Sequence, residues 1–593
     1  MFLKNKLILF QESRRFAVLL IVLAALLVYG RSLSNEFIWD DHSIISKNDF
    51  IKSWGNFSRV FNESYLTKIS NFENLDVFDI GSGETSYRPV LTITYFLDHH
   101  FWRLNPFGFH LTSLLLHVAN CILLYFFVCL LSQNKKLSLF TALLFCVHPV
   151  NSEAVGVVSF REDVLVSLFC LGAFILYIRA KRFLGAKKLA LNVFSVACFF
   201  LALFSKETAL VFPLLILGYI YFFSKEEFKA NFCLKFPWSG YIVAVLFYII
   251  VRFFLFVNTS YLQGAYPTPI FLTNVLTMLR VCAVYIVWAF IPLNLHPRLS
   301  NDTELICSSF LETGCIFSAV LLILLVILTA RLSKKMPVLS FSVLWFFVTF
   351  IPISNIFYTL TNYVACRYLY LPLAGLCVFF TLILFKFPYD KVLNVSRTFA
   401  MNLIIIILLF FSFLTFLRNF TWQNDFSLWE EMAEQYPDNS MAHIGLAGVY
   451  KNYGIFGQAI VEYKRALRLP IAVSDAAEVV SELGVCYFQK GLIEKAIKNF
   501  RKAVELDPAL YSAYVNIGCA FGQKGDYPEA INWFKQVLAL SPRHVKAYNN
   551  LGITYAKMGE MEKAKHVWEK ALEIEPSYKE AENNLNKLDN RTN

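Results

Sequence analysis

The sequence predicts an all-helical protein in two parts: a polytopic bundle of about eleven membrane-spanning helices, followed by a soluble solenoid of helical repeats. Of the 593 residues, 57% are hydrophobic and only 16% are charged, whereas about a quarter of the residues of a soluble protein are charged. After residue 440 the charged share rises to about that soluble value. We therefore exclude an ordinary cytosolic enzyme and expect a membrane domain over 1–420 and a repeat domain over 421–593.

The first part contains apolar runs of the length that a membrane span requires. A helix needs roughly 17 to 25 such residues to cross the hydrocarbon layer, where its backbone groups must bond within the segment. No small-residue cleavage site follows Gly30, so we expect the first run to stay as an anchor. The expected spans are 16–30, 110–132, 137–150, 163–179, 189–204, 208–224, 239–257, 312–331, 338–357, 368–385 and 399–417.

Basic residues in short loops predict the orientation, because such loops face the cytosol. The basic clusters follow alternate spans if 271–292, with Arg280 in its middle, lies as a re-entrant or interfacial helix and does not cross. The clusters are Lys4 to Arg15, Lys135 to Lys136, Arg179 to Lys188, Lys225 to Lys235, Arg331 to Lys335 and Lys386 to Lys391. The net charge of +11 then indicates orientation and not nucleic-acid binding.

The repeat domain is expected on the non-cytosolic side of this membrane. That side is the periplasm if the membrane is a bacterial inner membrane, or the lumen if it is the endoplasmic reticulum.

The second part repeats one pattern with a step of about 34 residues, the tetratricopeptide period. Small residues allow paired helices to pack closely, and a proline ends the second helix. We expect about four repeats, with a half repeat at 425–437 and a polar capping helix at 579–589. The pattern is Leu483-Gly484-Tyr487-Ala496-Phe500-Ala503-Pro508, which recurs from Ile517 and from Leu551.

A repeat array of this kind has a concave face that holds peptides or other proteins. Asn516 and Asn549 occupy one repeated position, where an amide can bond a peptide backbone or bridge neighbouring helices. The alternative to a binding array is a purely structural spacer.

The first external loop opens with two adjacent carboxylates, Asp40 and Asp41. Because like charges repel, one of them is expected to have a raised pKa or to bind a cation. Either property suits a general base or a metal ligand. The alternative is an ordinary acidic start of a loop.

Further ionisable residues fall on the same predicted face, and such residues at membrane depth usually mark a functional site. The cations suit a phosphate group, which they bind through charge-assisted hydrogen bonds, although each arginine alone can also be a snorkelling residue. The candidate phosphate-binding residues are Arg88, Lys206, Arg252 and Arg367. The candidate supporting residues are His148, Glu153, Arg161, Asp163, Glu207 and Tyr368.

A divalent metal on the oxygens of Asp41, Glu153 and Asp163 is left open. No other cofactor is predicted, and the sequence contains no phosphate-cradling glycine-rich loop, GxSxG elbow or HExxH motif.

Several short segments of the chain, in their order along the sequence, resemble those of the multi-span GT-C glycosyltransferases. The resemblance is strongest to the transmembrane and tetratricopeptide repeat O-mannosyltransferases with their bacterial relatives. The resemblance covers nearly the whole chain, including the repeats. The segments that carry it are Phe37-Ile38-Trp39-Asp40-Asp41, Tyr87-Arg88-Pro89, Asn105-Pro106-Phe107-Gly108-Phe109-His110, His148-Pro149-Val150-Asn151-Ser152-Glu153-Ala154-Val155, Ser205-Lys206-Glu207-Thr208 and Arg367-Tyr368-Leu369-Tyr370-Leu371-Pro372.

The resemblance implies a sugar donor on a polyprenyl phosphate, such as dolichyl-phosphate mannose. It implies that Asp40 deprotonates an acceptor hydroxyl on a protein during an inverting displacement. Two alternatives from other classes are a non-catalytic membrane scaffold that recruits proteins through the array, and a transporter of a lipid-linked sugar. The scaffold tolerates loss of Asp40 and Arg367, and the transporter needs the arginines but not the acidic pair.

Overall fold

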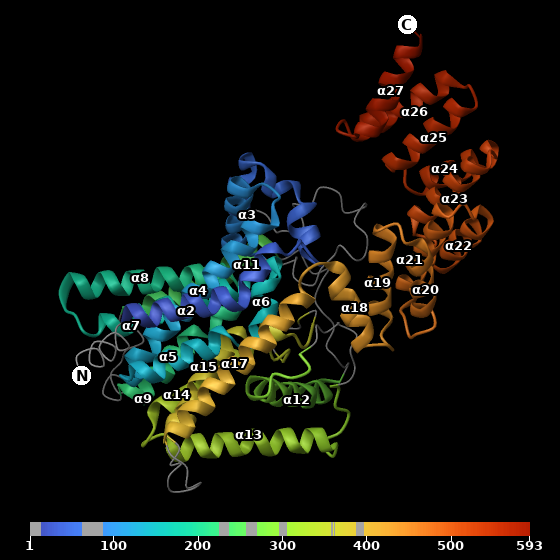
Figure 1. The fold of residues 1–593 in the computed structure, drawn as a ribbon. Coiled ribbons are helices and arrows are strands. Elements are labelled where there is room, and N and C mark those ends of the chain that lie inside the picture. Colours follow the sequence, from blue (N-terminus) through green and yellow to red (C-terminus); the bar gives the residue numbers. More distant parts are fainter. Residues whose placement is uncertain are drawn as a thin grey trace. The chain divides into compact units, whose positions relative to one another are not determined.

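The computed structural model describes residues 14–61, 87–224, 236–256, 270–295, 305–356, 360, 362–386 and 397–592, and over these residues the chain forms helices and no strands. The chain divides into two compact units, Met1–Leu428 and Trp429–Asn593. Figure 1 shows the helices of both units. The all-helical class predicted from the composition and the repeats is confirmed.

The first unit is built from apolar helices. Its longer helices are α2 (Arg14–Tyr29), α3 (Pro89–Trp102), α4 (Pro106–Ser132), α5 (Lys135–Cys146), α7 (Arg161–Ala180), α8 (Gly185–Leu203), α9 (Phe212–Phe223), α11 (Trp238–Phe256), α12 (Phe271–Phe290), α13 (Thr313–Leu332), α14 (Pro337–Phe350), α15 (Tyr370–Lys386) and α17 (Arg397–Thr421).

Eight helices among the described residues are long and apolar enough to cross a membrane. A further pair, Lys135–Cys146 with Pro149–Gly156, passes the same criterion but is bent by 47°. Shorter apolar helices cover Glu207–Phe223, Trp238–Arg252 and Pro337–Ile353. The chain is therefore a multi-pass membrane protein.

The segment 271–292 was expected not to cross. In the structure, α12 is a helix of 20 residues that is apolar and long enough to cross, and it packs against α13. Length and composition thus give no ground for excluding it, and only the charges of the loops argue against a crossing. The total of about eleven spans stays a prediction. Of the basic clusters used for the orientation, residues 1–13, 225–235 and 387–396 lie outside the described residues.

Local sequence explains where two of the central helices begin. The Asn105 side chain accepts a hydrogen bond from the Phe107 backbone N–H at 3.2 Å, and Pro106 supplies a first helical residue that needs no amide partner. Asn134 caps α5 in the same way, through the Leu137 N–H at 3.1 Å. The Asn105-Pro106 motif therefore has a structural role as the start of α4.

Four helix pairs make up the second unit, and one helix stands before them and one after. The pairs are α19 (Ser440–Asn452) with α20 (Phe456–Ala466), α21 (Val473–Gln489) with α22 (Ile493–Leu506), α23 (Tyr511–Lys524) with α24 (Tyr527–Leu540), and α25 (Val545–Lys557) with α26 (Met561–Ile574). The flanking helices are α18 (Asp425–Gln435) and α27 (Lys579–Thr592).

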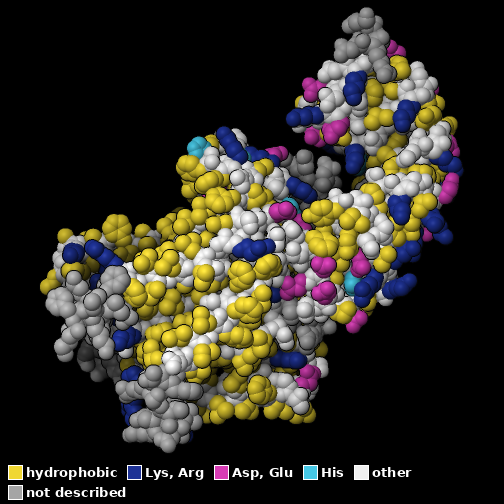
Figure 2. All heavy atoms as spheres, in the orientation of Figure 1, with side chains coloured by type: hydrophobic (Ala, Val, Ile, Leu, Met, Phe, Trp, Pro, Cys, Tyr) yellow, Lys and Arg dark blue, Asp and Glu magenta, His cyan; other side chains and the backbone are white. Residues whose placement is uncertain are grey.

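The surfaces of the two units differ in composition. Figure 2 shows hydrophobic side chains over much of the visible face of the first unit, while charged side chains are scattered over the second. Large exposed hydrophobic residues of α13, such as Leu324 at 59% and Ile323 at 57%, suit contact with lipid.

Candidate functional site

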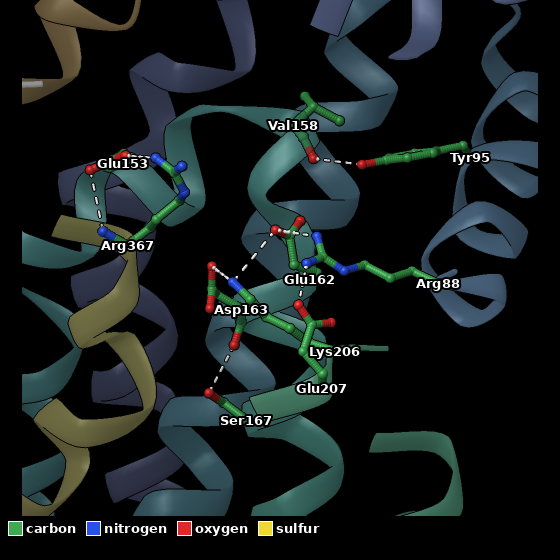
Figure 3. A network of polar contacts seen from close by, with 10 residues as sticks. All are labelled: Arg88, Tyr95, Glu153, Val158, Glu162, Asp163, Ser167, Lys206, Glu207 and Arg367. Carbon is green, nitrogen blue, oxygen red and sulfur yellow. Dashed lines mark hydrogen bonds and ion pairs between the residues drawn. The ribbon is translucent and has the colours of Figure 1, made fainter. Parts of the chain in front are cut away.

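The ionisable residues singled out in the sequence gather where helices of the first unit begin or end. They come from the loop after the first span, the start of α3, the short helix α6 (Ser152–Gly156), the start of α7, and the short 3-10 helices η10 (Glu207–Val211) and η14 (Cys366–Leu369). Figure 3 shows two of the networks that they form, one between Glu153 and Arg367 and the other around Arg88 and Lys206. The structure thus brings together side chains that lie far apart in the sequence.

The two adjacent carboxylates have different environments. Both oxygens of Asp41 accept backbone hydrogen bonds: Oδ1 from Ser159 at 2.6 Å, and Oδ2 from Val158 and Ile38, both at 3.4 Å. Asp41 is fully buried. It therefore fixes the loop to the chain that precedes α7, and these contacts suit a positioning residue better than a base; the catalytic role predicted for Asp41 stays untested.

Asp40 is also buried, but its Oδ1 has no hydrogen-bond partner among the described residues. Burial raises the pKa of Asp40 to about 7, the positive charge of Arg367 opposes the shift, and the negative charges of Asp41 and Glu162 add to it. Burial also raises the pKa of Asp41 to about 6, against the hydrogen bonds from Ser159. Asp40 thus has the uncommitted oxygen and the pKa near neutrality that a general base requires.

The loop that carries this pair is held by a residue that the sequence did not single out. Trp39 has a positive φ of 51°, and its N–H donates to Asp425 Oδ1 at 2.9 Å. The other oxygen of Asp425 lies 2.6 Å from His42 Nε2, and this hydrogen bond raises the pKa of His42. His42 and Asp425 are 383 positions apart, so no local pattern could have revealed the pair.

Arg367 and Glu153 form the ion pair on one side of the site. Arg367 Nη1 lies 2.5 Å from Glu153 Oε1, and the Arg367 backbone N–H donates to Glu153 Oε2 at 3.2 Å. The guanidinium also lies over the ring of Phe160 at 3.8 Å and near that of Tyr368 at 5.0 Å. Both charged side chains are at most 5% exposed.

A second network joins Arg88, Glu162, Asp163, Lys206 and Glu207. Arg88 contacts Glu162 at 2.9 Å and Glu207 at 3.0 Å, and Lys206 contacts Asp163 at 2.6 Å and Glu162 at 3.5 Å (Figure 3). The Nε of Arg88 and one oxygen each of Glu162 and Glu207 are buried without a partner among the described residues. Three of the four cations predicted to bind phosphate, Arg88, Lys206 and Arg367, are therefore already paired with carboxylates, but one guanidinium donor of Arg88 remains available.

Arg161, predicted as a supporting residue, is fully buried and belongs to a third ion pair. Its guanidinium lies 2.7 Å from Asp98 Oδ2 and donates to Ser113, to Thr94 and to the Phe109 carbonyl. All of these partners are on or next to α3 and α4. Arg161 thus connects α7 to both helices.

Other predicted residues take different positions. His148 Nε2 bonds the Ala289 carbonyl at 3.1 Å, and its ring packs on Phe411, so this histidine holds α12 and α17 and contacts none of the ion pairs described above. Arg252 is half-buried and attracts Glu207 electrostatically. The Tyr368 ring lies 5.3 Å from Lys206 Nζ.

The oxygens of Asp41, Glu153 and Asp163 do not form a common group of metal ligands among the described residues. Each binds a different partner: backbone amides, Arg367 and Lys206 respectively. A divalent metal at the site stays an untested prediction.

In the array, Asn549 contacts a neighbouring helix. Its side-chain oxygen accepts a hydrogen bond from Asn584 Nδ2 at 2.9 Å, which connects α25 to α27. Asn516 is half-buried, and its role toward a peptide stays a prediction.

The fold and the charged site define a multi-pass helical membrane protein with a repeat array. Models of the tetratricopeptide repeat match residues 484–525 and 520–559 and residues 545–578. The repeats predicted from the 34-residue period are therefore confirmed.

Over about three quarters of its length, the chain is similar to protein O-mannosyl-transferases. It is 26% identical to "Protein O-mannosyl-transferase F38B6.6" of Caenorhabditis elegans, over 76% of this chain and 62% of that protein. It is 27% identical to "Protein O-mannosyl-transferase TMTC1" of Homo sapiens, over 76% of this chain and 55% of that protein. These relatives confirm the resemblance predicted from the motifs, although the chain spans only 55% to 62% of their length.

A solved structure is similar to part of the chain. The match to the crystal structure of MamA has 24% sequence identity and a TM-score of 0.23. It covers 25% of this chain and 85% of the MamA chain.

Proposed function

We propose that the chain is a membrane glycosyltransferase that moves mannose or a similar hexose from a polyprenyl-phosphate donor to a hydroxyl group on a protein. The observation that carries the proposal is Asp40, a buried carboxyl with an unpartnered oxygen and a pKa of about 7. The names of the relatives support the reaction class.

In the proposed reaction, Asp40 accepts the proton of the acceptor hydroxyl as the hydroxyl oxygen attacks the anomeric carbon of the sugar. The bond from that carbon to the phosphate oxygen breaks, and the polyprenyl phosphate leaves with its electron pair. Attack from the opposite face inverts the configuration. A base with a pKa near the working pH combines a sufficient deprotonated fraction with sufficient basicity.

Arg88 is the best-supported contact for the donor phosphate. Its Nε is buried without a partner among the described residues, and guanidinium groups bind phosphate through paired hydrogen bonds. Lys206 and Arg367 supply further positive charge, although each must share its donors with a carboxylate. The carboxylates limit the net positive charge, which favours a phosphodiester, with its single negative charge, over a more highly charged group.

The repeat array is proposed to bind the acceptor protein, because tetratricopeptide arrays are protein-binding surfaces. We place the array and the site on the periplasmic or lumenal side, from the charges of the predicted loops. The hydrophobic tail of the donor would stay in the bilayer beside the apolar helices.

The test compares two aspartates of one loop in the purified full chain. Asp40→Asn keeps the shape of the side chain but removes the base, so transfer from polyprenyl-phosphate mannose to a threonine-containing protein acceptor, or hydrolysis by water, should fall about 10² to 10⁴-fold. The control is Asp49→Asn, because the Asp49 side chain is 77% exposed and pairs only with Lys52 in the contacts observed.

The control variant should retain the activity of the wild type. If the wild type transfers sugar and Asp40→Asn transfers it equally well, Asp40 is not the base. If the wild type neither transfers nor hydrolyses any lipid-linked sugar, while deletion of the array abolishes cellular function, the scaffold interpretation replaces the enzyme.

A further inference from the structure

A second cluster of reactive side chains lies in the interior of the bundle and takes no part in the proposed reaction. His117 and Cys121 are one turn apart on α4, and Cys146 is the last residue of α5. One ligand atom from each of the three side chains lies within 4.8 Å of the other two. All three residues are buried, with at most 1% exposure. Two thiols and an imidazole are thus held together in an apolar core.

The surroundings orient the histidine. His117 Nδ1 lies 2.7 Å from the hydroxyl of Tyr370, and this hydroxyl also accepts a hydrogen bond from Asn120 at 3.3 Å. When Nδ1 carries the proton and donates it to Tyr370, Nε2 is left as the ligand atom. Metal-bound histidines commonly make such a bond through the nitrogen that does not bind the metal.

A fourth polar group lies beside the cluster. The hydroxyl of Tyr29 is fully buried and has no hydrogen-bond partner among the described residues. The Tyr29 ring packs edge-on against His117 at 5.1 Å, and its hydroxyl is close enough to Cys121 and Cys146 to interact with them electrostatically. A buried hydroxyl without a partner is costly, and a bound ion or its water would supply one.

We propose that His117, Cys121 and Cys146 form a structural zinc site that ties α4 to α5, with Tyr29 facing the fourth position. In a tetrahedral site with Zn–S near 2.3 Å and Zn–N near 2.0 Å, sulfur and nitrogen ligands lie about 3.5 Å apart. The distance from Cys121 Sγ to His117 Nε2 is 3.7 Å. The pair is therefore already spaced for a common metal.

Charge favours a divalent ion over monovalent copper, and among divalent ions the thiolate and imidazole ligands are those of structural zinc sites. Two thiolates neutralise a divalent ion, and the neutral group is tolerated in an apolar interior. A monovalent copper ion with the same two thiolates would leave a buried negative charge. Binding releases the two thiol protons and replaces the hydrogen bond between His117 Nε2 and the Cys146 carbonyl, 3.1 Å apart, with a metal bond.

The experiment measures metal in the purified full chain, in detergent, after expression with added zinc and extensive dialysis. Elemental analysis should find about one zinc per chain, and exchange for cobalt should produce the absorption bands of thiolate-to-cobalt charge transfer. These two readouts need no variant and do not depend on glycosyltransferase activity.

Variants then assign the ligands. Cys121→Ser and Cys146→Ser should each lose most of the zinc, whereas Cys170→Ser should keep it. Cys170 is the matched control because it is equally buried, in α7, and is outside the cluster. Absence of zinc and of a cobalt spectrum in the wild type would overturn the proposal, as would a Cys121–Cys146 disulfide found by mass spectrometry of the purified chain.

Discussion

The ion pairs of the candidate site in the membrane unit and the Lys524–Glu494 pair of the repeat array differ in how far they are removed from water. Arg367 and Glu153 are 5% and 3% exposed, whereas Lys524 and Glu494 of the array are 49% and 74% exposed at a contact distance of 2.6 Å. Removing charges from water costs several kcal/mol per ion, which their attraction does not always offset. The membrane unit therefore retains buried charge at the expense of stability, which is expected where charge has a function.

The strongest test of this comparison is Arg161→Met in the membrane unit. The change leaves Asp98 buried without its partner at 2.7 Å, and loss of one partner of a buried pair destabilises by about 3 to 5 kcal/mol. Thermal unfolding of the full chain in detergent should show the largest decrease here. Arg161→Lys keeps the charge but not the planar set of donors. Its unfolding temperature should therefore lie between those of the wild type and Arg161→Met. A variant as stable as the wild type would show that Arg161 is not needed to hold α7.

The adjacent aspartates allow the same comparison within one loop. Asp41→Ala removes the acceptor of the buried Ser159 and Val158 N–H groups, and an unsatisfied buried donor costs about 1 to 3 kcal/mol. Asp40→Asn should not lower the stability of the folded chain above pH 7. We expect the first variant to unfold at a lower temperature and the second to lose activity with its fold intact. Equal loss of stability in both would remove the distinction between base and positioning residue.

The pH dependence of Asp40→Asn follows from linkage. The folded pKa of Asp40 is about 7, above the value of about 3.9 in an unfolded chain. The folded state therefore binds the proton more tightly, so this contribution to stability is complete below pH 3.9 and is lost as the pH rises to 7. Asp40→Asn should flatten the decrease in stability between these values, as measured by unfolding temperature against pH, while Asp49→Asn should not.

In the array, we expect stability to depend on the packing of the helices and not on ion pairs. A methyl group added at Gly552 would lie 2.4 Å from Trp568 Nε1, and this ring is held by a hydrogen bond to the Asn549 carbonyl at 3.1 Å. Overpacking of this kind costs about 1 to 3 kcal/mol. Gly552→Ala should lower the temperature at which the array unfolds. Limited proteolysis at increasing temperature measures this change.

Gly448→Ala is the control for this change. The nearest atom to an added methyl group there is Tyr463 Oη at 4.0 Å, so alanine should be neutral or slightly stabilising in the helix. A similar decrease in both variants would indicate that the Gly552–Trp568 contact is not the cause.

The sequence predicted more of the contacts in the array than in the membrane unit, because the contacts of the array are local in sequence. The array repeats its contacts at fixed, short spacings, so the positions of Gly484 and Phe500, or Gly552 and Trp568, could be paired in advance. In the membrane unit, Arg367 and Glu153 are 214 positions apart. The sequence indicated that these residues face one site, but which acid meets which base depends on tertiary packing.

The acidic pair shows the same limit. Asp40 and Asp41 are the same residue type, and their difference arises from the positive φ of Trp39 and from the backbone of residues 158–159. Asp425 was expected in a half repeat of the array. In the structure its carboxylate contacts Trp39 and His42 in the loop of the acidic pair. Spacing rules describe neighbours along one helix, and such rules contain nothing about a contact across 383 positions.

Lys524→Met should have the smallest effect of all. The Lys524 ammonium is 2.6 Å from Glu494, a shorter contact than that of Arg161 with Asp98, so distance alone would rank it as the stronger pair. Because both partners are solvated, water replaces the lost contact and the unfolding temperature of the array should not change measurably. If Lys524→Met instead lowered stability as much as Arg161→Met, exposure to water would not be what separates the two classes of ion pair.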